Sequence, residues 1–137
     1  MGDWAGFFAD MVPNDEANRR ATIERLAREQ RLATDKLIAD AWFVDEASER
    51  VLKHFASCVG KEPPYQLEGL EVRDGSNARL VFGGHVEDRV DRFRVLEAVA
   101  ARCREKLKGS GFTVYAIDRE DGYYVDHYSL SFQRSSY

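Results

Sequence analysis

The longest stretch without a helix breaker constrains this chain most, because residues 14–59 contain neither glycine nor proline. Asn14 is a good N-cap, and acidic residues follow it in the first turn. One helix of this length would extend about 68 Å at a rise of about 1.5 Å per residue, whereas a compact chain of this size is roughly 35–40 Å across. We therefore expect a break, with Thr34 or Asp45 capping the next helix, and a helical hairpin. The alternative is one long helix that projects and packs on something else.

The two halves of this helical stretch differ in polarity. Residues 15–33 interleave acidic and basic side chains and carry few large apolar ones. This pattern is typical of a solvated or coiled-coil-like charged face. From residue 37 onward, apolar residues recur at helical spacing and predict a core-facing helix. They are Leu37, Ile38, Ala41, Trp42, Val44, Val51, Leu52, Phe55 and Val59.

Residues 1–13 form a predicted amphipathic arm that ends at Pro13. Four large apolar residues recur at i, i+3, i+4 and i+7 and share one helical face. They are Trp4, Phe7, Phe8 and Met11. Such a stripe fits a partner's groove, a second copy of the chain, or the protein's own core. The polar side of the arm carries acidic residues and no basic ones, which disfavours a membrane surface.

The remainder of the sequence predicts a hairpin, a helix and a second hairpin. A linker with two adjacent prolines covers 60–65. The first hairpin is expected over 66–83, with its turn at Asp74-Gly75-Ser76-Asn77. An amphipathic helix follows over 86–108 and the second hairpin over 112–133. Residues 14–137 are therefore expected to form a single α+β domain, in which a four-stranded antiparallel sheet has helices on one face.

The expected sheet leaves its other face open to solvent or to a ligand. Strand alternation places Leu130 and Phe132 in the core and leaves Tyr123 and His127 on the outer face. Tyr115 on the neighbouring strand lies on the same face if the register allows. An exposed sheet face with aromatic residues indicates a recognition surface.

Composition excludes several classes of protein. The chain of 137 residues is 44% hydrophobic and 32% charged, with a net charge of −4. These values fit one globular domain and exclude a disordered, collagen-like, membrane-spanning or bulk-basic nucleic-acid-binding chain. The two cysteines, Cys58 and Cys103, are expected to be reduced thiols. Without a signal-peptide pattern at the N-terminus, we expect the protein in the cytoplasm.

Signals for chemistry are weak. Gly83-Gly84-His85 precedes a helix and resembles an anion-binding turn, but the acidic residues that follow would repel a phosphate. Asp126 and His127 are adjacent on a strand and point to opposite faces, so they do not form a catalytic pair. His54 and Cys58 are spaced for metal binding, but two ligands do not make a zinc site. We expect no cofactor, no metal and no catalytic residue.

The pattern as a whole favours a non-catalytic protein-binding module. We expect a small acidic adaptor, inhibitor or chaperone-like subunit, bacterial or phage-encoded, that binds another protein or a second copy of itself. The candidate contact residues are Trp4, Phe7, Phe8, Met11, Tyr115, Tyr123 and His127. Two alternatives remain: a ligand-binding or hydrolytic domain with a pocket near His85 and His127, and nucleic-acid binding through the sheet aromatics. The net negative charge disfavours the second alternative.

Overall fold

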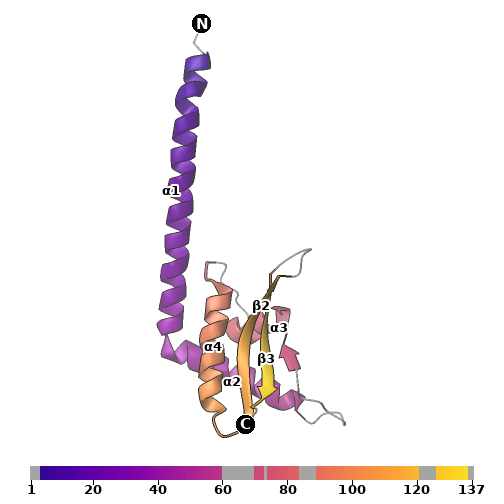
Figure 1. Ribbon diagram of the computed structural model, residues 1–137. Coiled ribbons are helices and arrows are strands. Elements are labelled where there is room, and N and C mark those ends of the chain that lie inside the picture. The colour runs from indigo at the N-terminus through magenta and orange to yellow at the C-terminus, as the bar shows by residue number, and fades with distance from the viewer. Residues whose placement is uncertain (1–3, 60–69, 73, 84–88, 121–125, 136–137) are drawn as a thin grey trace.

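A computed structural model describes residues 4–59, 70–72, 74–83, 89–120 and 126–135. Helices α1 (Trp4–Ala39) and α2 (Ala41–Cys58) come first, followed by strand β1 (Leu70–Val72). Helices α3 (Asp74–Phe82) and α4 (Arg92–Lys106) follow, and strands β2 (Phe112–Glu120) and β3 (Asp126–Arg134) end the chain. Figure 1 shows α1 projecting from a body made of the other elements, with its N-terminal end far from the sheet.

The long helical stretch breaks at Asp40, and the expected caps at Thr34 and Asp45 are wrong. Asp40 has an extended backbone, and its carboxylate accepts a hydrogen bond from the Phe43 amide at 3.1 Å. This is N-cap geometry, which starts α2 in a new direction. The expected helical hairpin does not form, because α2 crosses the base of α1 instead of returning along it (Figure 1).

The expected end of the arm at Pro13 is also wrong, because α1 is continuous from Trp4 to Ala39. Proline has a backbone φ close to the helical value and removes one hydrogen bond from the ladder.

The predicted four-stranded sheet is wrong as well. The described sheet has three strands in the order β1-β3-β2, all antiparallel. Nearly all of it is the β2–β3 hairpin, at the place where the sequence predicts one, and β1 adds only three residues. The first predicted hairpin fails because Asp74-Gly75 begins α3 instead of a turn. Linker 60–65 and residues 66–69 lie outside the described residues.

Helix α3 forms because its buried positions recur at helical spacing. Asn77 and Val81, four residues apart, are both buried. Arg50 of α2 donates hydrogen bonds to the carbonyls of Leu80 and Val81, each at 2.9 Å, and so caps the end of the helix. Gly83 then leaves the helix with a positive φ of 69°.

The core lies between one face of the sheet and helices α2, α3 and α4. Phe55 of α2 stacks on Phe132 of β3, with ring centroids 4.1 Å apart. The buried residues of α4 line the other side of this core. They are Val95, Leu96, Val99, Ala100 and Cys103. Helix α4 begins at Arg92 with Asp91 as N-cap, later than the predicted start at residue 86; residues 84–88 lie outside the described part of the chain.

Candidate protein-binding surface

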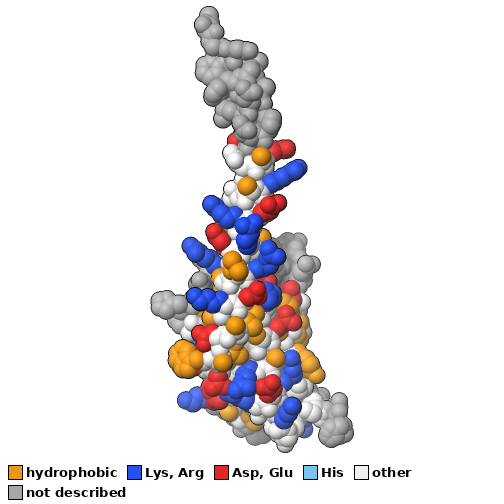
Figure 2. Space-filling view, turned by 90° about the vertical axis from the view of Figure 1, so that its left-hand side faces the viewer, with side chains coloured by type: hydrophobic (Ala, Val, Ile, Leu, Met, Phe, Trp, Pro, Cys, Tyr) orange, Lys and Arg blue, Asp and Glu red, His pale blue; other side chains and the backbone are white. Residues whose placement is uncertain are grey.

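The free part of α1 is the most exposed described element of the molecule. We call residues 4–32 the shaft. Every residue from Asp15 to Leu32 is exposed, including Ile23 at 60%, Leu26 at 53% and Leu32 at 64%. Figure 2 shows acidic and basic side chains interspersed along the outward side of the helix. The shaft therefore presents large apolar side chains in a nearly neutral charged surface, as interaction helices do.

The base of α1 is anchored to the body by polar and apolar contacts. Thr34 is fully buried, and its hydroxyl accepts a hydrogen bond from the Asp91 amide at 2.8 Å while donating to the Gln30 carbonyl at 2.6 Å. Asp35 pairs with Arg94 of α4 at 2.7 Å. Ala33, Leu37 and Ile38 pack against the core. These contacts fix the direction in which the shaft leaves the body.

Trp42 of α2 is also exposed, and its predicted place in the core is wrong. Its exposed fraction is 73%. Because Asp40 caps α2, the buried face of that helix is set by Ala47, Val51 and Phe55, and Trp42 lies on the opposite side. The helical periodicity of the sequence predicts an apolar stripe. It does not show that the break at Asp40 changes which side of the following helix faces the core. Trp42 is therefore a candidate contact residue that the sequence analysis missed.

The outer face of the sheet carries Tyr115, exposed by 48%. The guanidinium of Arg104 lies 5.6 Å from the centre of its ring and donates a hydrogen bond to the Val114 carbonyl at 2.8 Å. Arg104 thus covers the free edge of β2, which protects it from pairing with another strand. The neighbouring Ser129 and Ser131 on β3 are buried, so this part of the face is covered and not open as the sequence analysis expects.

The predicted contact residues fall into two separate groups. The backbone positions of Trp4, Phe7, Phe8 and Met11 lie in the first turns of α1, at the far end from the sheet (Figure 1). Tyr115 pairs with Ser131, and His127 pairs with Arg119 farther along the same hairpin. Tyr123 and His85 lie outside the described residues. The arm and the sheet face therefore do not form one continuous surface.

The described residues offer little for ligand or metal chemistry. A cavity of about 10 Å³ between α3, α4 and β3 has room for one water molecule. The amide oxygen of Asn77, which lines this cavity, is buried and has no hydrogen-bond partner among the described residues. His54 Nε2 lies 3.8 Å from Cys58 Sγ. No group of three potential metal ligands occurs among the described residues.

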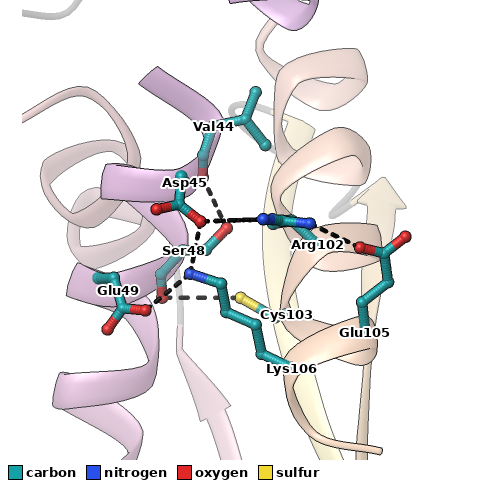
Figure 3. A network of polar contacts seen from close by, with 8 residues as sticks. All are labelled: Val44, Asp45, Ser48, Glu49, Arg102, Cys103, Glu105 and Lys106. Atoms are coloured by element: carbon teal, nitrogen blue, oxygen red, sulfur yellow. Dashed lines mark hydrogen bonds and ion pairs between the residues drawn. The ribbon is translucent and has the colours of Figure 1, made fainter. Parts of the chain in front are cut away.

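A network of charged side chains joins α2 to α4 (Figure 3). Asp45 accepts contacts from Lys106 at 2.7 Å and Arg102 at 3.2 Å. Lys106 also reaches Glu49 at 2.7 Å, and Arg102 reaches Glu105 at 2.8 Å. These charged groups pair with one another across α2 and α4 and hold the two helices together, so we assign the network a structural role.

The pKa values of this region follow from these contacts. Hydrogen bonds from Lys106, then from Arg102, hold the pKa of Asp45 below its ordinary value. The same contact raises the pKa of Lys106, and Glu105 does most to raise the pKa of Arg102. Burial raises the pKa of the Cys103 thiol to about 11, which makes it a poor nucleophile.

Comparison with known proteins supplies no relative. No protein-family model matches the chain, and no curated protein or solved structure is detectably similar to it. Among the described helices, none is both long and apolar enough to span a membrane.

Proposed function

We propose that this protein is a non-catalytic protein-binding module whose main contact element is the shaft of α1. It acts as a small adaptor, inhibitor or chaperone-like subunit, bacterial or phage-encoded, in the cytoplasm, by occluding or assembling a protein partner. The observation that carries the proposal is the exposure of three large apolar residues on a helix that projects from its body: Ile23, Leu26 and Leu32.

The energetics of an isolated helix support this proposal. A helix without tertiary packing is only marginally stable in water, even when its sequence favours it. In the shaft, the ion pair Arg25–Glu29 at 4.0 Å is exposed and contributes little. Burying an exposed Leu or Ile side chain contributes about 1.5–3 kcal/mol. A partner that covers Ile23 and Leu26 therefore stabilises the shaft and gains affinity from it.

The charge pattern favours a protein partner over a nucleic acid or a membrane. Acidic and basic residues alternate along residues 15–36, and the whole chain carries a net charge of −4. Nucleic acids and anionic membranes select continuous basic surfaces. A protein surface with both signs of charge complements such a helix.

A capture experiment with matched variants tests the proposal. The tagged full chain is compared with Ile23→Glu/Leu26→Glu, which places charges on the apolar face of the shaft. The control is Ala17→Glu/Ala21→Glu, which adds the same charge on the opposite side of the same helix. We expect the wild type and the control to bind a stoichiometric protein, or themselves, and the test variant to lose this binding.

Circular dichroism and thermal unfolding establish that all three chains are folded. The proposal is wrong if the folded wild type binds no protein and does not self-associate. It is also wrong if the test variant retains every association of the wild type.

A further inference from the structure

Along one face of the shaft, apolar, acidic and basic residues follow one another in an order that complements the same face of a second copy running in the opposite direction. Successive residues of an α-helix turn by about 100°, so eight positions from 8 to 26 share one face of α1. In chain order they are Phe8, Met11, Val12, Asp15, Arg19, Thr22, Ile23 and Leu26. The face therefore reads apolar, acidic, basic, apolar, and its midpoint lies at residue 17.

We propose that the partner of the shaft is a second copy of this chain, bound antiparallel with α1 against α1 and centred on residue 17. This inference rests on the proposed function and names its partner. In this alignment position 8 lies beside position 26 of the partner, and Asp15 lies beside the partner's Arg19. The two-fold axis repeats both pairings, and position 11 lies beside position 23 of the partner.

Charge complementarity selects the antiparallel arrangement. A parallel copy places Asp15 beside the partner's Asp15 and Arg19 beside the partner's Arg19, which is repulsive. The antiparallel copy converts the same four charges into two ion pairs. Asp15 and Arg19 are both exposed and make no ion pair within the part of the chain that the structure describes, so both are available.

The length of the shaft fits the same alignment. With the centre at residue 17, position 4 of one copy lies beside position 30 of the other. The first residue of α1 that packs on the core is Ala33, so the overlap ends where the body begins. It is about 40 Å long. The two bodies then lie at opposite ends of the paired helices.

Charge reversal in the full-length chain tests this dimer by sedimentation equilibrium. The wild type is expected to dimerise, and Asp15→Arg or Arg19→Asp to weaken the dimer about tenfold or more, because each substitution creates two like-charge contacts. An equimolar mixture of the two variants restores the dimer as a heterodimer, and the double variant Asp15→Arg/Arg19→Asp restores it as a homodimer. Glu24→Arg, on another side of the same helix, is the control that leaves the dimer unchanged.

Cysteine pairing tests the orientation. In a Cys58→Ser background, chains carrying Phe8→Cys and chains carrying Leu26→Cys are mixed under mild oxidation. The alignment predicts disulfides between the two kinds of chain. A disulfide between two Phe8→Cys chains indicates a parallel pair and overturns the proposal.

The remaining outcomes separate this inference from the proposed function. A monomeric wild type, or a dimer unaffected by either charge reversal, overturns the antiparallel dimer. If that monomer still captures another protein through Ile23 and Leu26, the protein-binding function stands and only its partner is different. If it captures nothing, both proposals fail.

Discussion

Thr34 marks the point at which α1 stops being exposed and becomes part of the body. Its hydroxyl donates to the Gln30 carbonyl and accepts from the Asp91 amide at the start of α4. A buried amide that loses its acceptor costs about 1–3 kcal/mol. We predict that Thr34→Val lowers the free energy of unfolding by about 1–3 kcal/mol, whereas Thr34→Ser, which keeps the hydroxyl, loses less. Urea denaturation of the three chains measures the difference, and equal midpoints for Val and Thr would contradict the contact.

The two cysteines differ in environment, and their reactivity should differ accordingly. Cys103 is buried with a pKa raised to about 11, whereas Cys58 is partly exposed. We predict that a thiol reagent near neutral pH labels Cys58 alone in the folded protein and both cysteines in denaturant. Rapid labelling of Cys103 in the folded protein would show that the contact between α2 and α4 opens easily.

The raised pKa also gives a dependence of stability on pH. The folded state holds the Cys103 proton more tightly than the unfolded chain, whose thiol has a pKa near 9.0. The stabilisation of the folded state by the protonated Cys103 thiol is therefore complete below pH 9.0 and declines as the pH rises toward about 11.

At the scale of elements, the network between α2 and α4 predicts sensitivity to acid. The pKa of Asp45 is lower in the folded state than its ordinary 3.8, so its contribution is complete above that value and is lost as the pH falls through the folded pKa. We predict that, as the pH is lowered, the urea midpoint of Asp45→Asn falls less steeply than that of the wild type. The effect is small because the pair is exposed.

A matched substitution controls for the loss of one carboxylate. Asp118 is exposed on β2, and Asp118→Asn should leave the acid dependence as in the wild type. The assignment of acid sensitivity to the network fails if the two variants behave alike.

Sequence analysis predicted the elements whose pattern of buried residues is visible within the element itself. It failed for elements whose structure depends on a contact with residues distant in the sequence. The β2–β3 hairpin follows from alternation within residues 112–133, and the structure has it. Helix α3 does not follow from its own sequence, because Asp74-Gly75 suits a hairpin turn as well as a helix start. Arg50 of α2 caps α3, and this contact between distant residues is invisible in a local pattern.

The candidate site shows the same limit. Periodicity placed Trp4, Phe7, Phe8 and Met11 on one helical face, and they do lie in a helix. It did not show that this helix continues through Pro13 and away from the body, because nothing in the sequence states what α1 packs against. Trp42 was misplaced for a related reason, since the break at Asp40 set which side of α2 is buried.

At the scale of the whole molecule, the protein combines a packed body with a projecting helix in which every described side chain from Asp15 to Leu32 is exposed. An unpacked helix is only marginally stable in water, and most helices in proteins are stabilised by the packing of one face. The central claim of this account is that a protein surface covers the face of the shaft that contains Ile23 and Leu26.

Backbone hydrogen exchange of residues 15–31 tests this claim most directly, because amide protection reports whether the shaft is packed. The wild type is measured in its associated form beside Ile23→Glu/Leu26→Glu, with Ala17→Glu/Ala21→Glu as the control. We predict slow exchange in the wild type and the control, and exchange close to the unfolded rate in the test variant. Exchange close to the unfolded rate in all three chains would contradict the claim, because the shaft would then have no partner.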